Sequence, residues 1–296
     1  MPGSMKSGSM RSASVRSVSV RSVSMRSWLC GLLLLLCLLS GASHAGTRCS
    51  THAIGPRELA AAAESAQRVY TALEQRNAPV ALIARHGQDL SHYGLYYSHV
   101  GFAVRDRSEG RWTVVHLLNF CGTDHSSLYA QGLVNFFADD LVNQDVRIVW
   151  LKPELAQRVT AILDSPEGNA LHNPHYSVIA RFDSRYYQNS TAWVLDVLAA
   201  AQLPAGVEPD RPHAQALELA TNSQPDTIHI PYSKRILGGL FSANTVFTDH
   251  PLAARLKGEY RVVTVHSILR WLDAIGATEG VREWRDGIEM TRPGST

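Results

Sequence analysis

Two runs of β-forming residues, 97–105 and 112–118, are separated by only six residues, most of them charged and one a glycine. A short polar connection with glycine between such runs is typical of a β-hairpin. A hairpin pairs its strands antiparallel, so the chain does not follow the alternating βαβ rhythm of a parallel sheet. We therefore expect an α+β fold with an antiparallel sheet packed against helices.

Apolar spacing along the rest of the chain predicts the other elements of this fold. Helices are expected at 57–76, 153–164, 191–202, 213–220 and 267–275, and strands at 80–84, 147–151 and 260–265. Together they form one domain over residues 46–296, in which the C-terminal portion 203–296 either completes the sheet or caps it. The sequence has no glycine-rich nucleotide loop and no HExxH motif, so no cofactor is predicted.

Residues 1–45 have the pattern of a secretory signal peptide. Five bases and no acid precede the apolar run 28–39, and small residues lead to a predicted cleavage after Ala45. A run this short rarely holds a helix across ~30 Å of hydrocarbon. We expect a periplasmic or secreted protein without a stable membrane anchor, the alternative being an uncleaved anchor. Translation starts at Met1 or at Met25.

The net charge argues against a nucleic-acid partner. The chain has 28 Lys and Arg against 26 Asp and Glu, but five of the bases lie in the predicted leader. The mature chain therefore carries 23 bases against 26 acids and has no basic stripe that would follow a phosphate backbone.

Two cysteines, Cys49 and Cys121, remain after the leader is removed. An even number in an oxidising compartment favours one disulfide. The alternatives for Cys121 are a buried free thiol and a catalytic thiol.

His99 and His116 are the candidate catalytic pair. Alternation along the first hairpin strand puts Phe102 on one face and His99 on the other. If the hairpin turns about residues 107–108, His99 lies opposite His116, at a Cβ separation of ~4.5 to 5.5 Å. His116 would then orient His99 as a general base. The alternative is a structural role for each histidine.

Ser190 stands at the predicted start of a helix, where backbone N–H groups and the helix dipole favour an oxyanion. This position suits a nucleophile. Serine is also a preferred N-cap, so a structural role is the alternative.

The order of these segments resembles the circularly permuted papain-like fold of NlpC-type cysteine peptidases and amidases. The resemblance lies in Ser-His-Val-Gly-Phe at 98–102, in the polar His116 on the next strand, and in Gln-Asn-Ser-Thr-Ala-Trp at 188–193. More closely, the chain resembles the exported bacterial family DUF2145 through residues 97–99, 116–121, 129–133 and 187–189. That resemblance covers most of residues 48–200.

The resemblance implies hydrolysis or transfer at an amide or ester bond of cell-envelope peptide or lipid. His99 would be the base, His116 its orienter, and Ser190 would occupy the position of the usual cysteine. A serine hydroxyl ionises far less readily than a thiol. The rival interpretation is therefore a catalytically silent periplasmic binding or accessory module.

Other polar residues near these segments have weaker claims to a site. His116, Cys121, Asp124 and His125 lie in one short stretch but match no compact zinc spacing, so no metal is predicted. Arg85, Asp89 and Ser91 precede the strand of His99. They are expected either to line the same cleft as His99 or to lie in a solvated loop. Tyr96 and Tyr97 are expected either to donate a phenolic hydrogen bond to an oxyanion or to pack in the strand.

Overall fold

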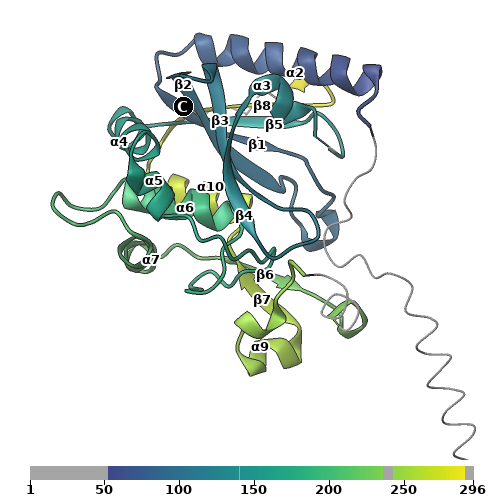
Figure 1. Ribbon diagram of the computed structural model, residues 1–296, viewed down its shortest axis with the longest axis vertical. Coiled ribbons are helices and arrows are strands. Elements are labelled where there is room, and N and C mark those ends of the chain that lie inside the picture. The colour runs from purple at the N-terminus through teal and green to yellow at the C-terminus, as the bar shows by residue number, and fades with distance from the viewer. Residues whose placement is uncertain (1–52, 140, 236–242, 291–296) are drawn as a thin grey trace, which may run out of the picture. The chain divides into compact units, whose positions relative to one another are not determined.

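The computed structural model describes residues 53–139, 141–235 and 243–290 (Figure 1). Its main element is a seven-stranded sheet in the order β4-β3-β2-β1-β5-β8-β9. All neighbouring strands are antiparallel, which confirms the α+β class with an antiparallel sheet. The strands are β1 (Val80–Arg85), β2 (His99–Arg107), β3 (Gly110–Asn119), β4 (Ser126–Gly132), β5 (Val146–Leu151), β8 (Thr278–Arg285) and β9 (Ile288–Glu289).

The predicted hairpin is β2 and β3, but its register differs from the expected one. Phe102 pairs with Val115, and Arg107 pairs with Gly110. The turn therefore lies at residues 108–109 and not at 107–108. Because a shift of the turn by one residue moves the pairing by two, Gly101 and not His99 lies opposite His116.

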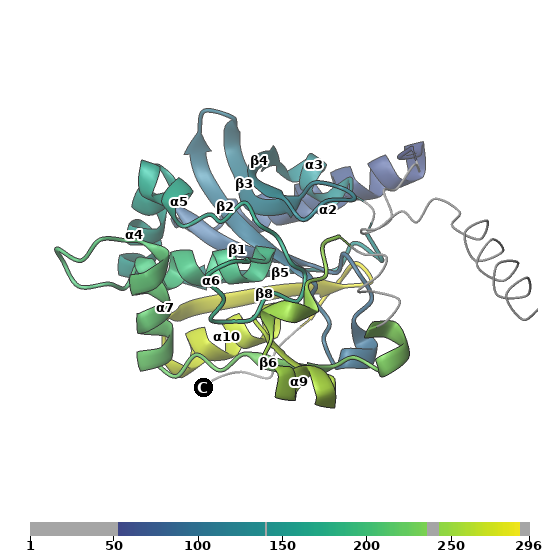
Figure 2. The same cartoon turned by 60° about the horizontal axis from the view of Figure 1, so that its bottom comes forward.

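Helices cover both faces of the sheet (Figure 2). α2 (Pro56–Glu74) and α3 (Leu133–Phe137) pack on one face, against residues such as Ala103 and Ile148. α4 (Pro153–Leu163), α6 (Ser190–Ala200) and α10 (Val265–Ala274) pack on the other. The hydrophobic core is thus divided into two layers by the sheet.

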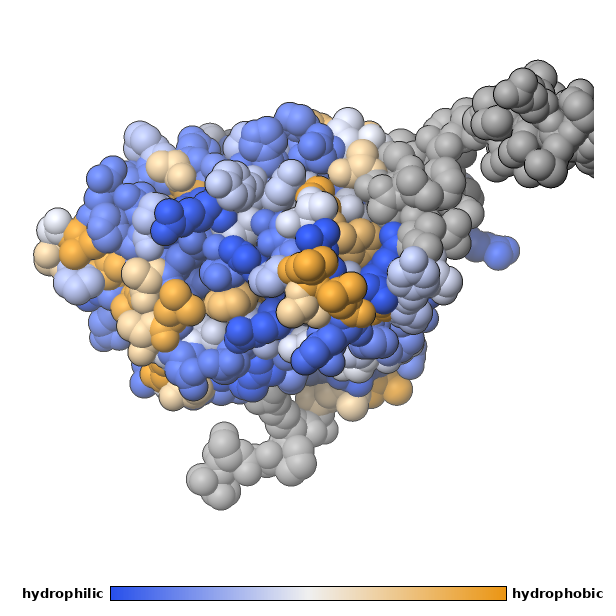
Figure 3. All heavy atoms as spheres, turned by 90° about the horizontal axis from the view of Figure 1, so that it is seen from below, coloured by the Kyte–Doolittle hydropathy of each residue, from blue (hydrophilic) through white to orange (hydrophobic). Residues whose placement is uncertain are grey.

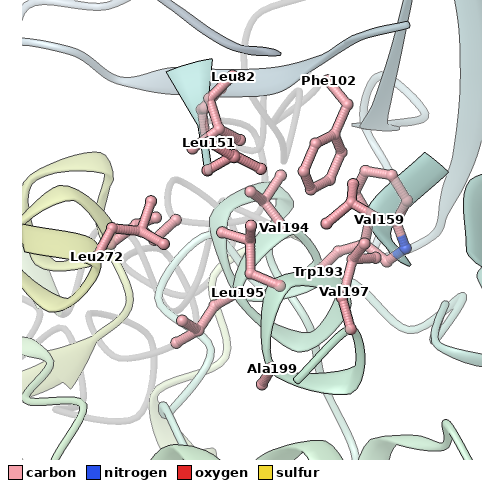
Figure 4. Close-up of a cluster of buried hydrophobic side chains, with 14 of the residues drawn as sticks. Leu82, Phe102, Leu151, Val159, Trp193, Val194, Leu195, Val197, Ala199 and Leu272 are labelled. Carbon is pink, nitrogen blue, oxygen red and sulfur yellow. The ribbon is translucent and has the colours of Figure 1, made fainter. Parts of the chain in front are cut away.

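α6 is the central helix of the second layer, since every one of its residues is buried. Figure 4 shows Trp193, Val194 and Val197 of this helix facing Phe102 and Leu82 from the sheet. A helix that is apolar all round belongs in a core. Each such side chain contributes about 1.5 to 3 kcal/mol by leaving water, so α6 is held firmly against the strands.

The C-terminal portion adds β8 and β9 to the sheet, because β8 pairs with β5 and β9 with β8. It also forms a separate two-stranded sheet of β6 (Asp226–His229) and β7 (Glu259–Val262). The remaining elements are the helices α5 (Pro166–Ala170), α7 (Arg211–Ala220) and α9 (Leu252–Lys257) and the 3-10 turns η1 (Ser91–Tyr93) and η2 (Phe247–Asp249).

The strand expected at 260–265 ends earlier, at Val262, because Thr264 caps α10 with a reciprocal hydrogen-bond pair to Ser267. Within the described part of the chain, no helix has the length and hydropathy needed to cross a membrane. The predicted signal peptide, residues 1–45, lies outside the described residues.

Candidate functional site

His99 and His116 form a hydrogen-bonded pair, as the sequence predicted. Nε2 of His99 lies 2.8 Å from Nδ1 of His116. The two residues are diagonal neighbours, so the contact depends on what stands between them. Gly101 faces His116, and a Cβ added at Gly101 would lie only 2.9 Å from the Cβ of His116. The absence of a side chain at Gly101 therefore allows the two rings to meet.

Gln131 of β4 determines which ring nitrogen donates in each hydrogen bond of the histidine pair. Its Oε1 lies 3.0 Å from His116 Nε2. Because a carbonyl oxygen only accepts, His116 Nε2–H donates to it, and His99 Nε2–H in turn donates to His116 Nδ1. Nδ1 of His99 is then unprotonated. It has no hydrogen-bond partner among the described residues and is not sealed from solvent. His99 thus presents a free acceptor.

Gln131 was not among the predicted site residues. The signal that could have found it is its place in the stretch 129–133, which carries part of the family resemblance.

Arg85 is buried beside the imidazole pair and keeps it uncharged. It pairs with His99 in the sheet, and its guanidinium binds the Asp139 carboxylate and stacks 4.5 Å from the Phe136 ring centroid. Burial, and then the charge of Arg85, lower the pKa of His99 well below its usual 6.5 and that of His116 to about 4. Both rings are therefore neutral at pH 7, and His99 is a hydrogen-bond acceptor of low basicity.

Ser190 is the first residue of α6, but it does not cap the helix. The N-cap is Asn189, whose Oδ1 accepts from the backbone N–H of Ala192 at 2.7 Å. The alternative prediction, that Ser190 caps the helix, is therefore wrong, because the preceding residue is the cap. The Ser190 hydroxyl lies beside the phenol of Tyr176, and burial raises the pKa of Tyr176 to about 12.

The helix that carries Ser190 and the side chain of His99 lie on opposite faces of the sheet. The His99 ring lies beside Phe136 of α3, with centroids 6.1 Å apart. α6 packs on the other face, where Phe102 meets Trp193 at 5.7 Å. Among the described residues, no hydrogen bond joins Ser190 to His99.

Both residues nevertheless line one large pocket, because the strand ends meet there. Arg85 ends β1, His99 begins β2 and Asn119 ends β3, so all three lie at the same end of the sheet. The pocket has a volume of ≈ 1020 Å³, at the upper end of the range for small-molecule sites. Its apolar wall includes Leu90, Tyr93, Leu95, Tyr97, Leu117, Leu118, Val178, Ile179, Ile228, Ile230, Phe247 and Val262.

The other sequence candidates divide between pocket and surface. Arg85 and Asp89 line the pocket. Ser91 is exposed, and its N–H donates to Asp89 Oδ1 at 2.9 Å, so it belongs to a solvated loop. Tyr97 is buried in the pocket wall, whereas the hydroxyl of Tyr96 is bound to the carboxylate of Asp145.

The stretch 116–125 does not assemble a metal site. The described residues contain no group of three or more His, Cys, Asp or Glu side chains placed to hold a metal ion. His116 belongs to the imidazole pair, and Asp124 pairs with His125 at 2.8 Å. Cys49 lies outside the described residues, so its pairing with Cys121 stays a prediction.

The chain was compared with known families, curated proteins and solved structures. No curated protein and no solved structure matches it. One bacterial family matches residues 72–272, a range that includes the imidazole pair, Gln131, Ser190 and most of the pocket. The chain therefore belongs to the family described as "Uncharacterized protein conserved in bacteria (DUF2145)".

Proposed function

We propose that this protein is an exported binding protein that holds an acyl-bearing molecule of the bacterial cell envelope without cleaving it. The observation that carries the proposal is the ≈ 1020 Å³ pocket, which is lined by aliphatic and aromatic side chains together with many polar and charged ones. Such a lining suits an amphiphile, whose hydrophobic part is buried and whose polar part is oriented by hydrogen bonds.

Two polar regions of the pocket would orient such a ligand. His99 Nδ1 can accept a hydrogen bond from a hydroxyl or amide group of the ligand. At the start of α6, the first backbone N–H groups point out of the helix and favour a carbonyl or anionic oxygen. An amphiphile with an acyl chain and a polar head satisfies both the wall and these groups.

The arrangement around Ser190 favours binding over cleavage. A serine nucleophile needs a base within hydrogen-bond reach, and among the described residues no hydrogen bond joins Ser190 to His99, whose ring lies beside Phe136 on the other face of the sheet. Tyr176 cannot act as that base near neutral pH, since burial raises the pKa of its phenol to about 12.

Titration with a fluorescent acyl probe, dansyl-undecanoic acid, tests the proposal. The protein should bind the probe saturably with one site, and palmitate should displace it. Leu118→Trp, which puts an indole into the pocket wall, should weaken binding at least about tenfold because it fills space the acyl chain needs. Leu59→Trp is the matched control, since Leu59 is 51% exposed on α2 and is not part of the pocket. Non-saturable binding, or equal affinity in both variants, would refute the proposal.

A second candidate function is hydrolysis of an amide or ester bond of an envelope peptide or lipid in a permuted papain-like fold. One observation favours it: His99, with a free Nδ1, and Ser190 line the same pocket. His99 and Ser190 would have to come within hydrogen-bond reach of each other before the serine could attack a carbonyl.

Replacing Ser190 with cysteine distinguishes the two functions. If His99 activates this position, Ser190→Cys should react with iodoacetamide at pH 7 at least about tenfold faster than the double variant Ser190→Cys, His99→Ala. If the pocket only binds, the two rates should agree. The unsubstituted protein gives the background from the native cysteines.

A further inference from the structure

The surface formed by α9 and by residues 232–235 exposes large apolar side chains. Leu252 and Leu256, one turn apart on the same side of α9, are 61% and 73% exposed, and Tyr232 is 69% exposed. Arg235 joins the two segments, because its guanidinium binds the carbonyl of Arg255 in α9 and lies 5.2 Å from the Tyr232 ring centroid. We call these residues and their neighbours the α9 surface.

Basic side chains surround the exposed leucines. Lys234 and Lys257 are exposed, and the partly buried Arg235 and Arg255 add two further charges. Glu259 is an acidic neighbour, so positive charge prevails. Figure 3 looks onto the end of the molecule where α9 lies and shows apolar residues, in orange, beside hydrophilic ones, in blue. Exposed leucines next to bases are unusual on a chain whose predicted mature form is slightly acidic overall.

We propose that the α9 surface docks onto an anionic lipid bilayer. Leucine and tyrosine side chains enter the boundary between headgroups and acyl chains, while lysine and arginine stay at the headgroups and attract anionic lipids. A protein partner would be expected to cover the leucines without needing four bases around them. The combination of positive charge and exposed apolar area therefore favours a lipid bilayer over a protein as the partner of this surface.

The pocket begins next to this surface. Ile230, Lys234 and Phe247 line the pocket, and the N–H of Ile230 donates to the carbonyl of Gly258, the residue that ends α9, at 2.9 Å. A docked molecule would present the pocket to the bilayer, so that an acyl chain could pass between them. This last step rests on the proposed function, whereas the docking itself does not.

Sedimentation with lipid vesicles tests the docking. The protein is purified in its exported form, and its N-terminus is established by intact mass, because an uncleaved leader would itself bind lipid. It should sediment with vesicles of phosphatidylethanolamine and phosphatidylglycerol and remain in solution with phosphatidylcholine vesicles. Leu252→Ser together with Leu256→Ser should reduce binding at least about tenfold. Lys234→Gln with Lys257→Gln should reduce the preference for the anionic vesicles.

Matched controls separate this proposal from the proposed function. Leu219→Ser replaces a leucine that is 59% exposed on α7 and should bind vesicles like the unsubstituted protein. The pocket variant Leu118→Trp should also bind vesicles normally, while the double leucine variant should keep its affinity for the soluble acyl probe. Docking is refuted if the unsubstituted protein ignores anionic vesicles, or if the double leucine variant binds them as well as the Leu219→Ser control.

Discussion

Two of the polar networks inside the described part of the chain make an instructive pair, because one has a member in the pocket wall and the other does not. The imidazole network consists of His99, His116 and Gln131. The carboxyl network joins α6 to α7 and consists of Gln188, Asp196, Arg211 and Glu218. Each of the two relies on a buried or nearly buried arginine, Arg85 for the first and Arg211 for the second.

The carboxyl network lies away from the pocket. Asp196 accepts from Gln188 Nε2 at 2.5 Å and from Arg211 Nε at 3.1 Å. Burial and the neighbouring charge of Asp196 raise the pKa of Glu218 well above its usual value. No member of the network lines the pocket.

The imidazole network ends differently, because its last atom, His99 Nδ1, has no partner among the described residues and is accessible from the pocket. Burial of polar groups therefore does not by itself identify a binding site, since both networks are buried. The carboxyl network also has an oxygen without a hydrogen-bond partner, Glu218 Oε1, but that atom is sealed in the core. What distinguishes the imidazole network is that its unused hydrogen-bonding position belongs to a residue of the pocket wall.

Removing Arg211 should have the largest effect on stability. Arg211→Met leaves the carboxylate of Asp196 buried without its cation, which costs about 3 to 5 kcal/mol. Urea denaturation at pH 7 measures this loss. Arg282→Met is the control, because the pair of Arg282 with Glu289 is exposed and its loss should cost less than about 1 kcal/mol. A cost below about 1 kcal/mol for Arg211→Met would mean that the carboxyl network does not hold α7 to α6.

The two networks should respond to pH in opposite directions. His116 titrates at about 4 in the folded protein and near ~6.5 when unfolded. Its contribution to stability is therefore fully present above about pH 6.5 and is lost as the pH falls toward 4, by up to about 3 kcal/mol. Glu218, with its raised pKa, loses its contribution as the pH rises above its unfolded value.

Urea unfolding between pH 4.5 and 8 measures both effects. His116→Gln should flatten the fall in stability on the acid side, and Glu218→Gln should flatten the fall on the alkaline side. If His116→Gln leaves the acid slope unchanged, His116 is not held neutral by its burial and by Arg85.

The sequence predicted most elements of the fold because their signals are local. Apolar spacing found α2, β1, β5, α4 and α6 to within a few residues. It missed β4, Ser126–Gly132, because this strand contains small and polar residues and is partly exposed. Gln131 was missed together with β4, because it contacts His116 only through the pairing of β3 with β4.

The candidate site was predicted in part. Alternation alone showed that His99 and Phe102 face opposite sides of β2, and the contact with His116 is confirmed. The face of the sheet on which α6 packs depends on tertiary structure. The sequence therefore did not show that α6, which carries Ser190, packs on the same face of the sheet as Phe102. A preference for serine at N-caps likewise could not decide between Ser190 and its neighbour Asn189.

Gln131→Leu should disturb the imidazole network moderately. The variant leaves His116 Nε2–H without an acceptor in a buried position, which costs about 1 to 2 kcal/mol. It also removes the group that sets the proton direction, so the tautomers of both histidines should change. Nitrogen NMR of labelled histidine measures this: the unsubstituted protein should carry its protons on Nε2 of His99 and of His116. Protons on Nδ1 of both residues would mean that the hydrogen bonds run in the opposite direction and that His99 offers no free acceptor to the pocket.

Ser190→Ala should have the smallest effect, and it tests the boundary of the pocket site. The variant breaks no side-chain hydrogen bond among the described residues and the helix keeps its cap, so it should cost less than one hydrogen bond, below about 0.5 kcal/mol. Asn189→Ala is the matched comparison and should cost more, because Asn189 caps α6 and also binds the carbonyls of Val178 and Val263. Thermal or urea unfolding ranks the two. If binding of the acyl probe is equal in Ser190→Ala and the unsubstituted protein, the polar contact to the ligand comes from His99, the open end of the imidazole network. A loss of probe binding would instead place the ligand's head at the start of α6.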